Sequence, residues 1–250
     1  MPMQLQQSTW PEVERYLETS TGVILPIGAT EQHGPIGVIG TDAICAEVIA
    51  KGVGAAAGAL VGPTIAVGMS EHHMRFPGSM TLRPSTLIAL LSDCVGSLTA
   101  HGFRRFFFVN GHGGNIASLQ AAFFEIYNEM RRAGFADAPQ VRCKAMNWWQ
   151  PEPVGALARE LFGAADGSHA AASEVALTQF VDAANIKSAP LDPPVAPRGG
   201  FYNSATFRQR YPDGRIGSNS GLATPEAGQR LYDAAVAAVA ADYQAFLAEA

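Results

Sequence analysis

The sequence predicts an α/β fold in which a mostly parallel central sheet carries helices on both faces. Apolar runs alternate with helical segments of about ten or more residues, the pattern of successive strand–helix–strand units. Hydrophobic residues make up 48% of the 250 residues and charged residues 16%, which suits a large buried core. Neither an internal repeat nor a linker interrupts the pattern, so residues 1–250 are expected to form a single domain.

Local signals justify the elements in order along the chain. Ser8 or Thr9 can cap a short helix over 11–17, which has a proline near its start. The apolar run 22–28 is bounded by glycines and predicts a buried strand. A helix over 42–53, a strand region over 59–68 and a helix over 84–100 follow.

The second half continues the alternation. The run RRFFFVN at 104–110 is the clearest strand, and a long helix follows it over 116–132. Residues 140–149 predict another strand and 169–181 a helix. Thr224, Pro225 and Glu226 form a cap, a proline and an acid in sequence, which begin an Ala-rich C-terminal helix. Segments 148–161 and 187–221 are expected to be loops, and the loops 148–161 and 190–213 to set specificity.

Composition and charge exclude several classes of function. The net charge is −5 and no Lys/Arg cluster occurs, so neither nucleic acid nor an anionic membrane is an expected partner. No apolar run reaches the roughly 20 residues of a membrane helix, and the polar N-terminus does not resemble a signal peptide. Cys45, Cys94 and Cys143 are widely spaced without a CxxC pair, which indicates reduced thiols and a cytoplasmic location.

Acids and imidazoles follow the predicted strands, at the edge of a parallel sheet where sites form. Glu31, His33 and Asp42 lie in GATEQHGPIGVIGTDA, and His112 lies in the turn NGHGGN. Two carboxylates and two imidazoles suit zinc, manganese or iron. Taken singly, the acids would also fit helix capping and the histidines ordinary loop positions; the four together favour a metal site.

Two further segments carry candidate residues. His72 and His73 are adjacent, so in an extended chain at most one of them should point into the site and the other should lie at the surface. His169 precedes Glu174 by five residues; at the edge of a helix both could serve one site, although Glu174 fits an exposed helix position equally well. A dinucleotide fingerprint beginning at Gly111 would need glycine at position 116, which is Ile116, so a nucleotide-dependent oxidoreductase is disfavoured.

Five motifs occur in the order seen in the creatininase (creatinine amidohydrolase) family, which this chain resembles over about residues 22–231. They are GATEQHGPIGVIGTD, SEHHMRFPGSMTL, NGHGGN, HAAASE and GSNSGLATPEAGQRL. The resemblance implies a three-layer α/β/α fold, two divalent metal ions per subunit and a homohexamer. It also implies hydrolysis of a C–N amide bond by a hydroxide held between the metals.

The resemblance implies roles for individual residues. Asp42 would bridge the two metals, Glu31 and His112 would complete one site, and His33 and Glu174 the other. His169 matches the proton-transfer histidine. Substrate contacts would come from Ser70 and Asp166, to which the sequence adds His73 and, as a possible lid, Trp148 and Trp149.

The chain departs from the creatinine hydrolases at two positions. Their carboxylate two residues after the NGH histidine is replaced here by Gly114, and their tryptophan before the aspartate is replaced by Ala165. The expected substrate is therefore a small, cyclic, creatinine-like amide in general terms. A formamide on a pyrimidine intermediate and a cofactor-precursor peptide, which other family members hydrolyse, are alternatives. A non-catalytic metal- or ligand-binding protein on the same scaffold is a third possibility.

Overall fold

A four-stranded parallel sheet forms the centre of the computed structural model, which describes residues 3–136 and 138–249. The strands are β1 (Gly22–Ile27), β2 (Leu60–Val61), β3 (Arg105–Asn110) and β4 (Arg142–Asn147), in the order β2-β1-β3-β4. All six residues of β1 are buried. Its continuous apolar run thus belongs to a strand covered on both faces.

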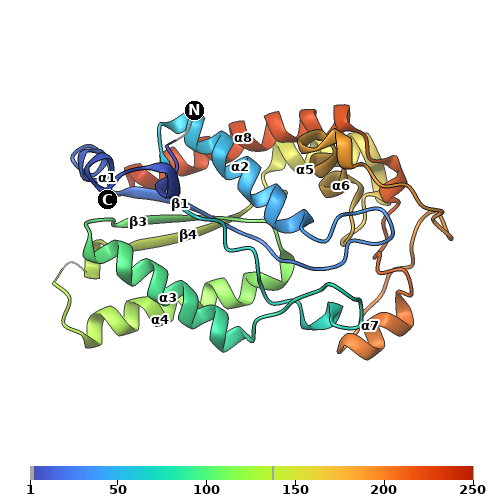
Figure 1. Ribbon diagram of the computed structural model, residues 1–250, viewed down its shortest axis with the longest axis horizontal. Helices are drawn as coiled ribbons and strands as arrows, with labels where there is room; N and C mark the ends of the chain where they lie inside the picture. The colour runs from blue at the N-terminus through green and yellow to red at the C-terminus, as the bar shows by residue number, and fades with distance from the viewer. Residues whose placement is uncertain (1–2, 137, 250) are drawn as a thin grey trace.

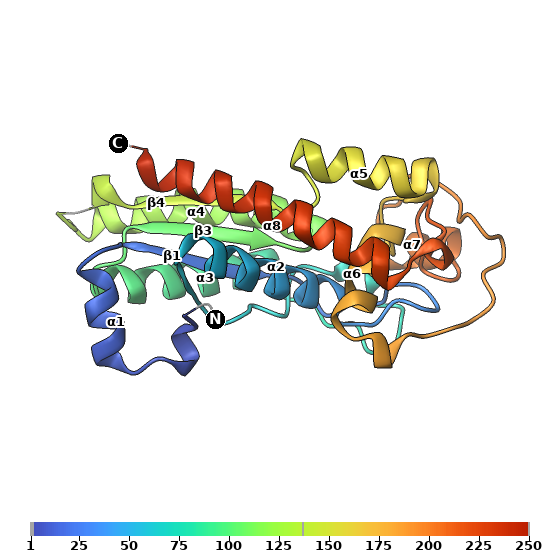
Figure 2. The same cartoon turned by 90° about the horizontal axis from the view of Figure 1, so that it is seen from above.

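Helices cover both faces of the sheet, so the α/β sandwich predicted from the sequence is confirmed (Figure 1). Helices α3 and α4 lie on one face, and α2, α5, α6 and α8 on the other (Figures 1 and 2). The helices are α1 (Trp10–Leu17), α2 (Thr41–Ala57), α3 (Pro84–Ala100), α4 (Ile116–Arg132), α5 (Glu152–Phe162), α6 (Ala172–Val181), α7 (Ser204–Arg210) and α8 (Pro225–Ala248).

Alternate residues of the strands supply the two cores. Val23 and Phe106 point toward α3 and α4, whereas Ile24 and Phe107 point toward α2 and α8. This alternation is the two-residue period of a strand. A third, smaller aromatic cluster joins Phe76 to Phe207 of α7 and lies near the carboxyl ends of the strands.

The main differences from the expected elements lie in the predicted loops. Helix α5 occupies most of 148–161, and α7 lies within 187–221. Helix α6 begins at Ala172 instead of at residue 169. The strand expected over 59–68 shortens to β2, and the chain beyond it makes only an isolated bridge from Ile65 to Ile27.

The strand order reverses at β1, which places a crevice between the carboxyl ends of β1 and β3. From β1 the chain crosses to β2 on one side, and from β2 it returns past β1 to β3 on the other. In open α/β sheets ligands bind at such a reversal. Within the described ranges, no helix combines the length and apolar character needed to cross a membrane.

Candidate metal centre

Two glycines bring the ends of β1 and β3 against the first turn of α2. A Cβ on Gly28 would lie 2.4 Å from the backbone nitrogen of Ala43, and one on Gly111 would lie 2.1 Å from the carbonyl oxygen of Asp42. Because any side chain at either position would collide with backbone, glycine is required there. The close approach places Asp42, the second residue of α2, at the crevice.

Asp42 lies between two imidazoles that come from different strands. Its Oδ1 is 3.0 Å from His33 Nε2, and its Oδ2 is 3.0 Å from His112 Nδ1. His33 follows β1 and His112 follows β3. The carboxylate therefore contacts the two histidines and does not cap its own helix, whose N-terminus has no side-chain cap.

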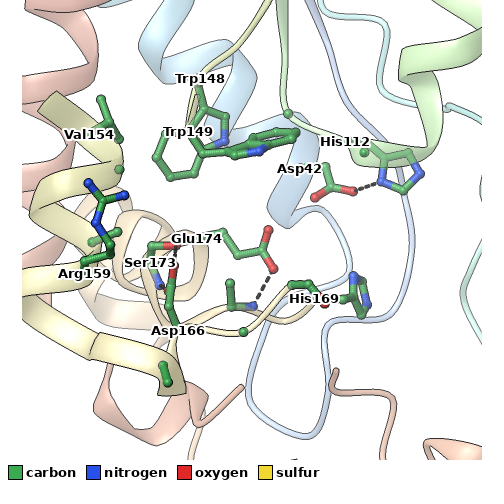
Figure 3. A pocket seen from close by; sticks show the side chains of 18 of the residues that line it. Asp42, His112, Trp148, Trp149, Val154, Arg159, Asp166, His169, Ser173 and Glu174 are labelled. Carbon is green, nitrogen blue, oxygen red and sulfur yellow. Dashed lines mark hydrogen bonds and ion pairs between the residues drawn. The ribbon is translucent and has the colours of Figure 1, made fainter. Parts of the chain in front are cut away.

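Two more carboxylates converge on the same point. Glu31 Oε2 lies 3.2 Å from His112 Nε2, and Glu174 Oε1 lies 3.8 Å from His33 Nε2. Glu174 is in the first turn of α6, where its Oε1 also accepts a hydrogen bond from the backbone N–H of Ala171 at 2.6 Å. Figure 3 shows Asp42, Glu174 and His169 around one end of the same pocket.

Backbone carbonyls fix which nitrogen of each imidazole carries a proton. His33 Nδ1–H donates to the carbonyl of Glu31 at 3.1 Å, and His112 Nε2–H donates to the carbonyl of Met69 at 2.9 Å. The opposite nitrogen of each ring then faces Asp42. At this separation of 3.0 Å a lone pair facing a carboxylate oxygen is repulsive, so each of these two nitrogens needs either a second proton or a cation.

The pKa values of the ionisable groups follow from this crowding. Burial lowers the pKa of His33, but the charges of Asp42 and Glu174 outweigh it and raise the value to about 10. Burial also lowers the pKa of His112, but the negative charges of Glu31 and Asp42 outweigh this effect and raise the value to about 9. Burial raises the pKa of Glu174 to about 7. The two imidazolium ions hold the pKa of Asp42 well below its usual range, against the effect of burial.

The donor set fits divalent cations. Both carboxylate oxygens of Glu31 and Oδ2 of Asp42 are buried without a hydrogen bond of acceptable geometry, although each lies within 3.0 to 3.2 Å of a histidine nitrogen. Buried anionic oxygens need a positive partner. Among the described residues, three groups have ligand atoms mutually within 4.8 Å: Glu31, Asp42 and His112; His33, Asp42 and Glu174; and Glu31, His33 and His169.

A cavity of about 450 Å³ opens from this cluster. That volume is within the range of about 300–1,000 Å³ that is usual for small-molecule sites. Trp148 and Trp149, which follow β4, form one wall, and α5 forms another (Figure 3). The indole Nε1–H of Trp148 is buried without a hydrogen-bond partner.

The expected substrate residues divide into two sets. Trp148, Trp149 and Asp166 line the cavity, whereas Ser70 and His73 do not line it. Both carboxylate oxygens of Asp166 accept hydrogen bonds from Ser173, which ties this acid to the start of α6. Ser70 is fully buried.

The prediction for His72 and His73 assumed that this segment is extended, and that assumption was wrong. Residues Glu71–His73 form a 3-10 turn, so both rings lie beside the cluster. His73 Nε2 is 3.1 Å from Glu31 Oε1. The half-buried ring of His72 lies 4.1 Å from that of His73 and 6.1 Å from that of His112, centroid to centroid, and is not a surface side chain.

Sequence reasoning missed two arginines that line the cavity, Arg159 of α5 and Arg198. Both lie in segments that were expected to be loops, so the prediction assigned no direction to either side chain. An apolar residue at every third or fourth position from Val154 onward was the available signal for α5.

Position 114 must be glycine, because the backbone there packs against the contact between His112 and the carbonyl group of Met69. A Cβ at this position would lie 2.3 Å from His112 Nε2 and 2.4 Å from the carbonyl oxygen of Met69. A longer side chain would break the contact between them. This backbone therefore excludes a carboxylate at position 114, and Glu174 is the further carboxylate that reaches the cluster.

Comparison with known proteins gives consistent results. The family model described as creatininase, creatinine amidohydrolase, matches residues 6–243. Mycofactocin precursor peptide peptidase of Mycobacterium tuberculosis (strain CDC 1551 / Oshkosh) is 38% identical over 127 residues, which are 47% of this chain and 50% of that protein. Creatinine amidohydrolase of Pseudomonas putida is 29% identical over 160 residues, which are 62% of this chain and 60% of that protein.

The chain thus spans about half the length of the curated relatives it matches. A solved structure described as "Creatininase Mn" is similar with a TM-score of 0.87 and 22% identity, and the match covers 100% of both chains. A likeness at that identity shows a common fold.

Proposed function

We propose that this chain, which belongs to the creatininase family over residues 6–243, is a metal-dependent hydrolase that cleaves a C–N amide bond in a small molecule. The observation that carries the proposal is the position of Asp42, whose two carboxylate oxygens face imidazoles from two different strand ends. A shared carboxylate between two donor sets is the arrangement needed to hold two cations side by side.

In this proposal Asp42 would help to hold both cations, which would be zinc, manganese or iron. Glu31 and His112 complete one site, and His33 and Glu174 complete the other, as two of the three close groups suggest. Bound there, two divalent cations would lower the pKa of a water molecule and polarise a carbonyl group. The carbonyl partners of His33 and His112 hold each ring in the orientation that presents its other nitrogen.

His169 is proposed to carry the proton. Burial and the neighbouring His73 and His33 lower its pKa well below the usual value, so the ring is neutral near pH 7. Its Nε2–H donates to the carbonyl of Gln32 at 2.8 Å, which leaves Nδ1 with a free lone pair. A C–O bond forms as the C–N bond breaks, and one proton of the attacking water passes through Nδ1 to the leaving nitrogen.

The substrate is proposed to be a small, cyclic, creatinine-like amide, held by Trp148, Trp149 and Asp166 along the cavity. Ser70 and His73 are buried and do not line the cavity, so the substrate contacts expected of them are not part of this proposal. A short peptide is a second candidate, since the cavity of about 450 Å³ exceeds the needs of a single small ring. The identity of 38% with a peptidase over 127 residues supports the same candidate. A formamide remains among the family's substrate types.

A homohexamer and a cytoplasmic location belong to the same proposal. The first is supported by the family resemblance, and the second by three cysteines that are all free thiols. Hydrolysis would be measured with zinc-, manganese- and iron-loaded protein on matched cyclic amides, formamides and short peptides. Turnover that requires the metal is expected on at least one class; bound metal without turnover on any class would support a non-catalytic binding protein instead.

A further inference from the structure

The side chain of Gln32 lies at the centre of a hydrogen-bonded group next to the carboxylate cluster. Gln32 is only 6% exposed and stands between Glu31 and His33 in the chain. Its Nε2 lies 2.9 Å from His73 Nδ1, 2.9 Å from His169 Nε2 and 3.0 Å from the carbonyl oxygen of Gly214. Three polar atoms therefore surround a group that has only two hydrogens, and the two hydrogens cannot serve all three.

Two backbone groups settle how the Gln32 amide is oriented. Its Oε1 accepts a hydrogen bond from the N–H of Gly34 at 2.8 Å, and its Nε2–H donates to the carbonyl of Gly214 at 3.0 Å. Exchanging oxygen and nitrogen would place two acceptors together at Gly214 and two donors together at Gly34. The amide is thereby fixed without reference to either histidine.

The second hydrogen of Nε2 has one possible destination. His169 Nε2 lies 2.8 Å from the backbone carbonyl oxygen of Gln32, so this nitrogen must carry a hydrogen and cannot accept one. The remaining Nε2–H of Gln32 therefore donates to His73 Nδ1 at 2.9 Å. Because Nδ1 of His73 accepts, its hydrogen resides on Nε2, which lies 3.1 Å from Glu31 Oε1.

The consequences for the two histidines are opposite. His73 carries its N–H at Nε2, 3.1 Å from Glu31 Oε1, whereas His169 has the lone pair of Nδ1 3.6 Å from the same carboxylate oxygen. The two rings stack 4.2 Å apart, and the edge of His73 packs against Phe207 of α7, so neither ring can turn freely. A hydrogen-bond donor and a proton acceptor thus lie side by side next to Glu31.

We propose that Gln32 is a positioning residue that fixes His73 as a donor through its side chain and His169 as a proton acceptor through its backbone carbonyl. Its catalytic consequence rests on the proposed function, whereas the two tautomers follow from the hydrogen bonds alone. Gly214 supports the arrangement, because a Cβ there would lie 1.9 Å from Gln32 Oε1. Any larger residue at position 214 would displace the amide.

The tautomers can be read directly from ring-nitrogen chemical shifts of zinc-loaded protein labelled with ¹⁵N-histidine. The chain has six histidines, so single His→Gln variants assign the signals. The expected spectrum shows His73 and His169 protonated at Nε2 and unprotonated at Nδ1. A wild-type spectrum with His73 protonated at Nδ1 would overturn the proposal, whether or not any variant folds and whether or not a substrate is known.

The variant Gln32→Met keeps the length of the side chain and removes its hydrogen bonds. We expect it to release His73 into a mixture of tautomers and to lower kcat by about 10–100-fold with the zinc content unchanged. Gln179→Met is the matched control, because Gln179 is 8% exposed on α6 and does not touch the cluster. Unchanged His73 signals in Gln32→Met would refute the role of the side chain.

Two combinations of results separate this inference from the proposed function. A tautomer change with unaltered kcat would confirm that Gln32 sets the tautomer and would refute its role as a positioning residue in catalysis. No turnover by wild-type protein on any amide, together with the expected spectrum, would refute the proposed function and leave the assignment of the tautomers intact. Gly214→Ala is a second variant, expected to reproduce the spectrum of Gln32→Met.

Discussion

Uptake of divalent metal by the metal-free protein is expected to release protons, and the number released should increase as the pH falls. Without metal, His33 and His112 hold protons that a cation must displace, because their pKa values are raised to about 10 and about 9. At pH 7, removing these protons costs about 4 kcal/mol at His33 and about 3 kcal/mol at His112, and the free energy of metal binding is reduced by these amounts. Filling both sites should release about two protons at pH 8.

Glu174 makes the pH dependence distinctive. Its pKa is raised to about 7 by burial, so it is mostly ionised at pH 8 and mostly protonated at pH 6. The number of protons released should therefore rise from about two at pH 8 toward about three at pH 6. Ionisation of a bound water would give the opposite trend, since it adds protons as the pH rises. Below the pKa of each histidine, competition from its proton lowers the metal affinity of that site about tenfold for every unit by which the pH falls.

Calorimetric titration with zinc in buffers of different ionisation enthalpy counts these protons. His101→Gln is the control, because His101 is an exposed residue at the end of α3, and the proton count should stay unchanged. His112→Gln should reduce the count by about one and leave one site. Release of fewer than one proton per protein, or a count that falls between pH 8 and pH 6, would refute the electrostatic account of the cluster.

Three further predictions concern single residues. Asp42→Asn should lose both metals together and lower activity at least about 100-fold, as metal analysis of the purified variant would show; retention of one full equivalent would contradict the shared role. His169→Gln should keep its metal and lower kcat about 10²–10⁴-fold, and an unaltered kcat would remove it from proton transfer. Gly228→Ala should lose about 1–3 kcal/mol in urea unfolding, because its Cβ would lie 2.0 Å from the carbonyl oxygen of Ala176, whereas Gly96→Ala, with open space, should gain up to about 1 kcal/mol. Equal changes in these two variants would disprove the close approach of α6 and α8.

The strands and most helices could be predicted because their signals are local. The runs at β1 and β3 are continuously apolar and bounded by glycine or a charged turn, and the structure buries nearly all of their residues. Helix α5 was missed because Pro151 and Pro153 suggest a loop, although a proline in the first turn is compatible with a helix. Helix α7 has only seven residues, and its Asn203 cap was the one signal available.

The sequence indicated which residues gather at the candidate site, but not which of them contact one another. Parallel topology brings strand ends to one edge, so Glu31, His33 and His112 could be grouped from the sequence. The pairing of each carboxylate with a histidine depends on how far α2 approaches the sheet, which the clashes at Gly28 and Gly111 define. The carbonyl partners of the imidazoles are backbone atoms, which residue types do not reveal.

The charge balance of the cluster explains how three carboxylates can be buried together before any metal arrives. Glu31 and Asp42 are at most 2% exposed, and 15% of the Glu174 side chain is exposed, so three acidic groups share a space with little access to water. Protons on His33 and His112 neutralise two of them in the metal-free protein, and the raised pKa of Glu174 allows the third to be neutralised near pH 7. Folding therefore does not have to wait for a cation, because protons occupy the positions next to the carboxylates that cations would take. The same argument explains why metal uptake and proton release must be coupled: one positive charge replaces another between donors whose positions are already set.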